Sequence, residues 1–200
     1  MKLTLPCVLL AGGKSSRMGR NKANLIFGDM TGEKLLKESL LSYQYKKMCQ
    51  IFERVFISCK AGANFDLEAD FLVETSELFS PLVGIENAFC ALDVPKIFFL
   101  SVDTPFLKES TIRALCALSG DYDVVCPENS ARAHYLMGVW DKRMGGNIKE
   151  AIKNAHYQVG SVVRASHFLC VEFEDEKEFC NLNTPEDYQE ALAYLRRDNG

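Results

Sequence analysis

The sequence predicts an α/β fold: a single three-layer α/β/α domain over residues 1–200, with helices on both faces of a mostly parallel sheet. Two observations predict it. Short apolar runs rich in Val, Ile and Phe alternate along the chain with longer segments of helical period, which is typical of parallel strands covered on both faces. The length of 200 residues suits one such domain, whose core needs no disulfide or metal for stability.

Seven apolar runs are expected to form the strands. In chain order they are Pro6–Leu10, Arg54–Cys59, Phe71–Glu74, Lys96–Val102, Asp123–Cys126, Leu136–Trp140 and Phe168–Phe173. The first run has some likeness to a secretory signal, but Pro6 interrupts it and Ala-Gly-Gly-Lys follows it, so we interpret it as a buried strand. With no secretory signal expected, the chain is predicted to be cytoplasmic.

Segments of helical period lie between these runs. Helices are expected near Glu33–Phe52, Val83–Leu92, Glu109–Leu118 and Asn147–Asn154. A final helix has the best-marked start, because Thr184 suits a cap, Pro185 suits the first helical position, and the acid Asp187 follows at the third.

Composition narrows the function classes. Lys plus Arg number 23 and Asp plus Glu number 27, so the net charge of −4 argues against a nucleic-acid coat or a basic membrane-binding surface. No stretch approaches the roughly 20 apolar residues of a membrane helix. The 8 cysteines form no C-x-x-C pair and lack His partners at zinc-finger spacing, so we expect reduced thiols and no structural zinc.

A glycine-rich basic loop follows the first strand. Gly12 and Gly13 allow a sharp turn that brings backbone N–H groups against an anion. Four cations follow within nine residues: Lys14, Arg17, Arg20 and Lys22. Backbone donors with Arg and Lys suit a polyphosphate, although a solvated basic turn is the alternative. A Walker P-loop is excluded, because its first glycine would fall at Val8.

The string from Leu10 to Lys22 contains the pattern L-A-G-G-x-x-x-R-M-G-x-x-K, starting at Leu10. It resembles the nucleotidyltransferases, in particular the molybdenum cofactor guanylyltransferases. The resemblance implies a Rossmann-like nucleotidyltransferase fold and Mg²⁺-dependent transfer of GMP from GTP to molybdopterin. It also implies that Leu10, Ala11, Gly12 and Gly13 wrap the nucleotide, and that Arg17 and Lys22 bind its phosphates and act in catalysis. The family usually has Asp before this Lys, where this chain has Asn21.

An aspartate follows the predicted central strand Lys96–Val102. A carboxylate at the end of an apolar strand needs a cation or hydrogen-bond donors, and an Asx turn that caps the next helix is the alternative. Asp103-Thr-Pro resembles the family segment whose Asp holds Mg²⁺, so Asp103 is the expected metal ligand and a catalytic residue. One carboxylate is sufficient, because substrate phosphates supply other ligands to magnesium.

Further residues align with the nucleotide site of the family. Pro81 and Gly84 match its G-P-L-x-G loop, although a helix-entry turn explains them equally. Ser58 stands where the family has an Asn that contacts the nucleotide, and Thr75 stands where it has an Asp. A shift of one residue would bring Glu74 to that second position.

Two asparagines precede the final helix. Asn181 and Asn183 match the family's N-x-N-T-P-E segment, which implies contact with the acceptor. Alternation along an extended segment would point both side chains to the same side. A plain helix start is the alternative.

The resemblance also implies transient contacts with molybdoenzymes and other cofactor-biosynthesis proteins, and no nucleic acid or membrane. Two alternatives stay open. One is a related nucleotidyltransferase that uses CTP or a sugar-phosphate acceptor. The other is a GTP-binding assembly protein without turnover, motivated by Asn21 and Thr75.

Overall fold

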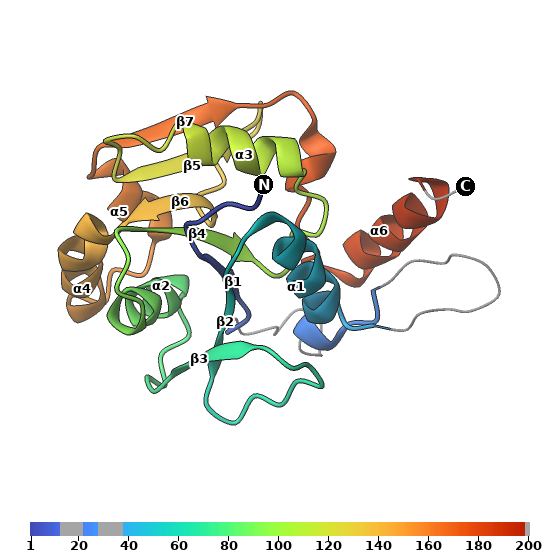
Figure 1. Ribbon diagram of the computed structural model, residues 1–200, viewed down its shortest axis with the longest axis horizontal. Coiled ribbons are helices and arrows are strands. Elements are labelled where there is room, and N and C mark those ends of the chain that lie inside the picture. Colours follow the sequence, from blue (N-terminus) through green and yellow to red (C-terminus); the bar gives the residue numbers. More distant parts are fainter. Residues whose placement is uncertain (13–21, 28–37, 199–200) are drawn as a thin grey trace.

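The structure, a computed structural model, describes residues 1–12, 22–27 and 38–198, with side chains as far as Leu195. All seven predicted strands are present. They are β1 (Cys7–Leu10), β2 (Val55–Lys60), β3 (Asp70–Glu74), β4 (Lys96–Ser101), β5 (Val124–Glu128), β6 (Met137–Asp141) and β7 (Phe168–Glu172). They form one sheet in the order β3-β2-β1-β4-β6-β5-β7. The α/β fold with a mostly parallel sheet is therefore confirmed (Figure 1).

The sheet is parallel except at β6, which runs antiparallel to both β4 and β5. Near its centre, Leu10 of β1 pairs with Ser58 of β2 on one side and with Ser101 of β4 on the other. The carboxyl ends of these three strands therefore meet at one edge. In open α/β sheets, ligands bind at this edge.

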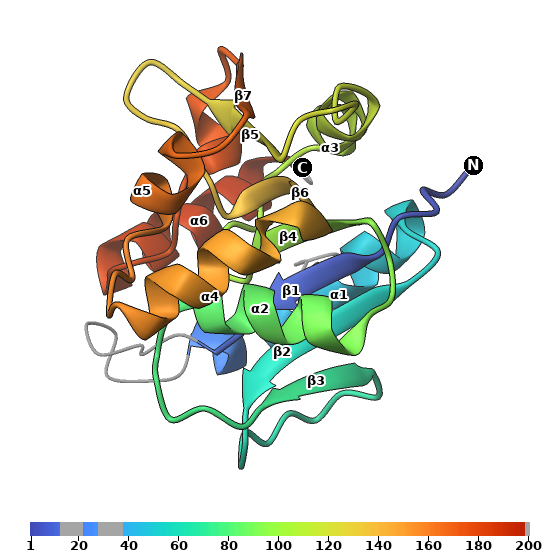
Figure 2. The same cartoon turned by 90° about the vertical axis from the view of Figure 1, so that its left-hand side faces the viewer.

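Helices cover both faces of the sheet (Figures 1 and 2). They are α1 (Leu40–Ile51), α2 (Pro81–Ala91), α3 (Glu109–Ala117), α4 (Gly145–Lys153), α5 (Val159–Arg164) and α6 (Pro185–Asp198). Three short 3-10 turns complete the described elements: η1 (Lys22–Asn24), η2 (Lys142–Met144) and η3 (Glu176–Phe179). No helix in the described part of the chain combines the length and apolar character that crossing a bilayer requires.

The helix predictions differ from the structure at two places. α1 begins at Leu40 because the hydroxyl of Ser39 accepts a hydrogen bond from the Ser42 N–H, at 3.1 Å. Positions 33–37 of the predicted helix lie outside the described residues. The prediction missed α5, whose 6 residues are too few to show a helical period.

The central strands alternate between two cores, one on each side of the sheet. Leu9 of β1 and Phe98 of β4 lie in the core covered by α1 and α3. Val8 and Phe99, their neighbours in the chain, lie in the core covered by α2 and α4. Figure 2 shows α2 and α4 together on one side of the sheet, with α1 beyond β1. Burial on both faces explains why these strands read as continuous apolar runs.

Gly138 of β6 has no room for a side chain. A Cβ built there would lie 2.1 Å from the carbonyl oxygen of Val125 on β5. We expect Gly138→Ala to lower the free energy of unfolding by about 3 kcal/mol, the upper end of overpacking costs. Gly146→Ala on α4 is the matched control, because nothing lies within 4 Å of its Cβ position. Urea denaturation of both variants measures the difference, and equal stabilities would contradict the prediction.

Candidate active site

Three side chains from distant parts of the chain meet at the carboxyl edge of the sheet. The ammonium Nζ of Lys22 donates to Asp103 Oδ2 at 2.9 Å and to Asn183 Oδ1 at 2.7 Å. Lys22 opens η1, Asp103 follows β4, and Asn183 lies just before α6. The side chains of Lys22 and Asp103 are only 16% and 13% exposed, so this ion pair is shielded from water on most sides. The structure thus brings together three of the residues predicted for the site.

The backbone and a neighbouring hydroxyl fix the Asp103 carboxylate. Ser101 Oγ donates to Asp103 Oδ1 at 2.6 Å, which leaves Oδ2 facing Lys22. The Leu182 N–H donates to the carbonyl oxygen of Asp103 at 2.8 Å, and this bond ties the asparagine segment to the turn after β4. A carboxylate held in this way presents one oxygen in a defined direction.

Two side chains of α1, the buried Gln44 and the half-buried Lys47, support the same turn. Gln44 Nε2 donates to the carbonyl oxygen of Thr104, and Lys47 Nζ donates to that of Pro105, each at 2.8 Å. Burial lowers the pKa of Lys47 to about 8, and Glu178 acts in the opposite direction. Neither Gln44 nor Lys47 is predictable as a site residue from the sequence, because polar residues on a helix carry no signal of a contact some 60 residues away.

A capping box fixes the segment that carries the two asparagines. The Asp187 N–H donates to Thr184 Oγ1 at 3.1 Å, and Asp187 Oδ2 accepts from the Thr184 N–H at 2.8 Å. The same carboxylate oxygen accepts from the Asn183 N–H at 2.9 Å. The predicted helix start is confirmed, and it holds Asn183 beside Lys22.

A buried carboxylate lies on the other side of β1. Glu74, the last residue of β3, is 4% exposed, and its Oε1 accepts from Ser58 Oγ at 2.8 Å. A Cβ on Gly12 would lie 2.8 Å from this Oε1, and one on Gly84 would lie 3.0 Å from it. Both glycines therefore let the backbone approach Glu74 closely. Thr75, the residue aligned with the family Asp, is exposed, whereas Glu74 is turned inward beside Ser58.

The helix that carries Gly84 begins at the same edge. Ser80 caps α2, with its Oγ accepting from the Leu82 N–H at 3.3 Å, and Pro81 occupies the first turn. The helix-entry role of Pro81 is thus shown, and its predicted contact with a nucleotide stays a prediction. Leu10 and Ala11 end β1 nearby, and the Ala11 N–H donates to the Ser58 carbonyl at 2.9 Å. Gly13, Arg17 and Asn21 lie outside the described residues.

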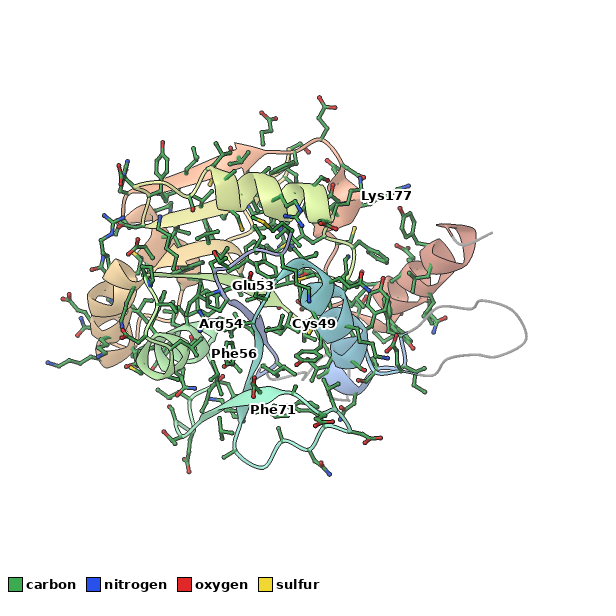
Figure 3. All side chains as sticks on the ribbon, in the orientation of Figure 1. Cys49, Glu53, Arg54, Phe56, Phe71 and Lys177 are labelled. Atoms are coloured by element: carbon green, nitrogen blue, oxygen red, sulfur yellow. The ribbon has the colours of Figure 1, made fainter. Side chains whose placement is uncertain are left out.

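A cavity of about 670 Å³ lies next to this cluster, between the loop after β5, η3 and α6. Both Asn181 and Asn183 line it. Its walls carry two ring pairs: His134 with Phe179 at 4.9 Å between centroids, and Phe106 with Tyr194 at 5.0 Å. Lys177 of η3, labelled in Figure 3, has its Nζ over the ring of Tyr194, and the distance to the ring centroid is 5.3 Å.

His134, which lines this cavity, carries a buried ring nitrogen. The residue is 7% exposed, and within the described part of the chain its Nε2 has no hydrogen-bond partner. Burial lowers the pKa of His134 to about 4, with Arg132 acting in the same direction, so the imidazole is uncharged at neutral pH. A buried polar atom without a partner is costly, which favours a ligand that completes the hydrogen bond.

The donor set around Asp103 suits a magnesium ion. Asp103 Oδ2 and Asn183 Oδ1 are hard oxygen atoms that already face one cation, the Lys22 ammonium. Within the described residues, no group of three or more His, Cys, Asp or Glu side chains has the arrangement of a metal site. A metal here would therefore take most of its ligands from water and substrate phosphates, as magnesium commonly does.

Comparison with known proteins shows the family of this chain. Residues 7–168 match the family described as the MobA-like NTP transferase domain. A Helicobacter pylori protein named molybdenum cofactor guanylyltransferase is 38% identical over 197 residues, which cover 96% of this chain and 94% of that protein. A Campylobacter jejuni protein of the same name is 31% identical over 196 residues, covering 96% and 97% of the two chains.

Solved structures share the fold. The molybdopterin-guanine dinucleotide biosynthesis protein A of Archaeoglobus fulgidus superposes with a TM-score of 0.79, at 16% identity, over 95% of this chain and 98% of that one. A nucleotidyl transferase from Methanothermobacter superposes with a TM-score of 0.77, at 13% identity, over 98% and 99% of the two chains. At these identities the likeness concerns the fold alone.

Proposed function

The chain belongs to the MobA-like NTP transferase family, together with proteins named molybdenum cofactor guanylyltransferases, and we propose that it transfers GMP from GTP to molybdopterin. The products are molybdopterin guanine dinucleotide and pyrophosphate. The observation that carries the proposal is the meeting of Lys22, Asp103 and Asn183 at the carboxyl ends of the central strands. This edge has the cation and the oxygen ligands that a nucleoside triphosphate with a metal ion requires.

The reaction needs positioning and charge neutralisation rather than a general base. A phosphate oxygen of the pterin attacks the α-phosphorus of GTP in line, and the bond from that phosphorus to the bridging oxygen of pyrophosphate breaks. The attacking oxygen is already an anion, so no side chain has to remove its proton. Lys22 supplies positive charge to the phosphates. A magnesium ion held by Asp103, with Asn183 beside it, would neutralise phosphate charge.

Glu74 supports guanine as the base. Guanine presents two adjacent donors, its N1–H and its 2-amino group, and an ionised carboxylate accepts both. The backbone at Gly12 and Gly84 approaches Glu74 Oε1 closely, so the end of β1 and the start of α2 both face this carboxylate. Cytosine and uracil have no such pair of donors on one edge. We therefore assign base selection to Glu74 rather than to the exposed Thr75.

The cavity beside Asn183 suits the acceptor. The stacked pair His134–Phe179 and the edge-to-face pair Phe106–Tyr194 line it with aromatic surface that suits a heterocycle. Asn181 and Asn183 join this cavity to the Lys22 ammonium. Molybdenum enters the reaction as part of the acceptor substrate.

The free state of all eight cysteines supports a reducing, cytoplasmic setting. Transfer of the product to molybdoenzymes would follow.

Pyrophosphate release tests the proposal. With molybdopterin and Mg²⁺ present, GTP should give pyrophosphate and molybdopterin guanine dinucleotide, whereas CTP, ATP and UTP should give little of either. Release from CTP would keep nucleotidyl transfer and contradict the guanylyl assignment. Tight Mg²⁺-dependent GTP binding without release, with an acceptor that a known guanylyltransferase uses, would instead support an assembly protein without turnover. EDTA should stop the reaction.

A further inference from the structure

Lys60, the last residue of β2, contacts four groups at and beside the carboxylate of Glu74. Its Nζ lies 2.6 Å from Glu74 Oε2 and donates to the carbonyl oxygen of Ser76 at 2.9 Å. It also donates to the carbonyl oxygen of Leu78 and lies 5.2 Å from the centroid of the Phe79 ring. The Lys60 side chain is only 15% exposed, so these contacts are made largely out of water.

The two carboxylate oxygens of Glu74 have different neighbours. Oε2 faces Lys60, while Oε1 faces Ser58 and the two close glycines. A buried carboxylate without a counter-charge is costly and tends to turn toward water. The ammonium of Lys60 supplies this counter-charge at Oε2 of Glu74. The ammonium therefore holds Glu74 turned inward through Oε2 and leaves Oε1 to Ser58.

Lys60 also holds the loop that closes this side of the site. The loop runs from Glu74 through Ser76 and Leu78 to Ser80, the cap of α2. Because α2 carries Gly84, the position of this loop sets the distance between Glu74 and the helix. The Lys60 ammonium thus connects the end of β2, the Glu74 carboxylate and the loop that leads into α2.

We propose that Lys60 is a positioning residue for base selection, acting through Glu74 and the loop of residues 75–79. This inference rests on the proposed function, since it assumes that Glu74 accepts from the base. Lys60 itself touches no nucleotide in this scheme. Its removal should therefore change which base is preferred more than how fast phosphate chemistry proceeds.

Lys96 provides a matched control at the opposite edge of the sheet. It is the first residue of β4, and its side chain is 20% exposed. Its Nζ donates to the carbonyl oxygens of Ser119, at 2.7 Å, and Gly120, and lies 3.8 Å from Asp141 Oδ2. Lys96 therefore makes the same kinds of contact as Lys60, far from the carboxyl ends of the strands.

The test compares Lys60→Met with Lys96→Met in their selection between GTP and ITP. The base of ITP, hypoxanthine, lacks only the 2-amino group of guanine. The ratio of the dissociation constants of ITP and GTP, measured by calorimetry with Mg²⁺, therefore reports the contact between the Glu74 carboxylate and that amino group. A hydrogen bond to a charged group is worth about 1.5–3 kcal/mol, so the wild-type ratio should be about 10–100-fold in favour of GTP. Lys60→Met should reduce this ratio by about tenfold, and Lys96→Met should leave it unchanged at a similar loss of thermal stability.

A double-mutant cycle separates positioning from general loosening. Glu74→Gln should lower the GTP-to-ITP ratio by itself, and Lys60→Met should lower it no further in that background. If Lys60→Met does not fold, Lys60→Gln keeps the donors for the carbonyl oxygens and lacks the charge, and it should also lose selectivity.

The outcomes distinguish this inference from the function on which it rests. An unchanged ratio in the folded Lys60 variants, or an equal loss in Lys96→Met, overturns the role of Lys60 even if the enzyme makes molybdopterin guanine dinucleotide. Wild-type protein that prefers GTP in binding but releases no pyrophosphate contradicts the proposed turnover, while the binding ratios still decide the role of Lys60. Wild-type protein that binds GTP and ITP equally overturns the inference outright.

Discussion

Lys22→Ala is expected to lower kcat/KM for GTP by about 10²–10³-fold, the usual loss when one preorganised donor to a developing charge is removed. Lys22 is held in advance by Asp103 and Asn183, at 2.9 and 2.7 Å, so its charge costs little reorganisation when the phosphates arrive. Steady-state pyrophosphate release measures the loss. Lys46→Ala is the control, because Lys46 is 63% exposed and its ammonium pairs with Glu38, away from Asp103 and Asn183.

The same substitution should strengthen the binding of a divalent cation when no nucleotide is present. In the structure the Lys22 ammonium lies on the oxygen atoms of Asp103 and Asn183 that a metal would use. Removing a cation from a carboxylate favours the approach of another cation. Mn²⁺ binding, followed by electron paramagnetic resonance, should therefore become tighter in Lys22→Ala while turnover falls. Activity close to that of wild type would remove Lys22 from the mechanism.

The strands and the start of α6 are predictable from the sequence because their signals are local. β1 and β4 are buried on both faces, so every residue from Cys7 to Leu10 is apolar, and no alternation has to be recognised. The capping box at Thr184 and Asp187 lies within four residues. The antiparallel direction of β6 has no such signal, since a buried apolar run reads the same in either direction.

The site is only partly predictable, because much of it is built from contacts between distant residues. Lys22 meets Asp103 across 81 positions and Asn183 across 161, and only resemblance to a family suggested that they belong together. Lys60 had no motif to mark it, since its role depends on a carbonyl 18 positions away and on a carboxylate in the next strand. Glu74 and Thr75 are the two candidates at the end of β3, and only the structure shows that Glu74 is buried while Thr75 is exposed.

Asp103→Asn is expected to cause the other large loss, again about 10²–10³-fold in kcat/KM, because the amide keeps the shape of the side chain but removes its charge. Neutral oxygen is a poorer ligand for magnesium, so the concentration of Mg²⁺ that gives half of the maximal rate should rise. Asp93→Asn is the matched control: the Asp93 side chain is fully exposed and pairs with Lys142 at 3.1 Å. It should leave both the rate and the Mg²⁺ dependence unchanged.

The affinity for Mn²⁺ distinguishes the role of Asp103 from that of Lys22. Asp103→Asn should weaken Mn²⁺ binding in the absence of nucleotide, whereas Lys22→Ala should strengthen it, although both variants lose turnover. Their kinetic losses should not add in the double variant, because each residue orients the other. A purely structural ion pair predicts the reverse: two unstable proteins with equal Mn²⁺ affinities. Opposite shifts in metal affinity therefore identify Asp103 as the metal ligand and Lys22 as the cation that neutralises it before the substrate arrives.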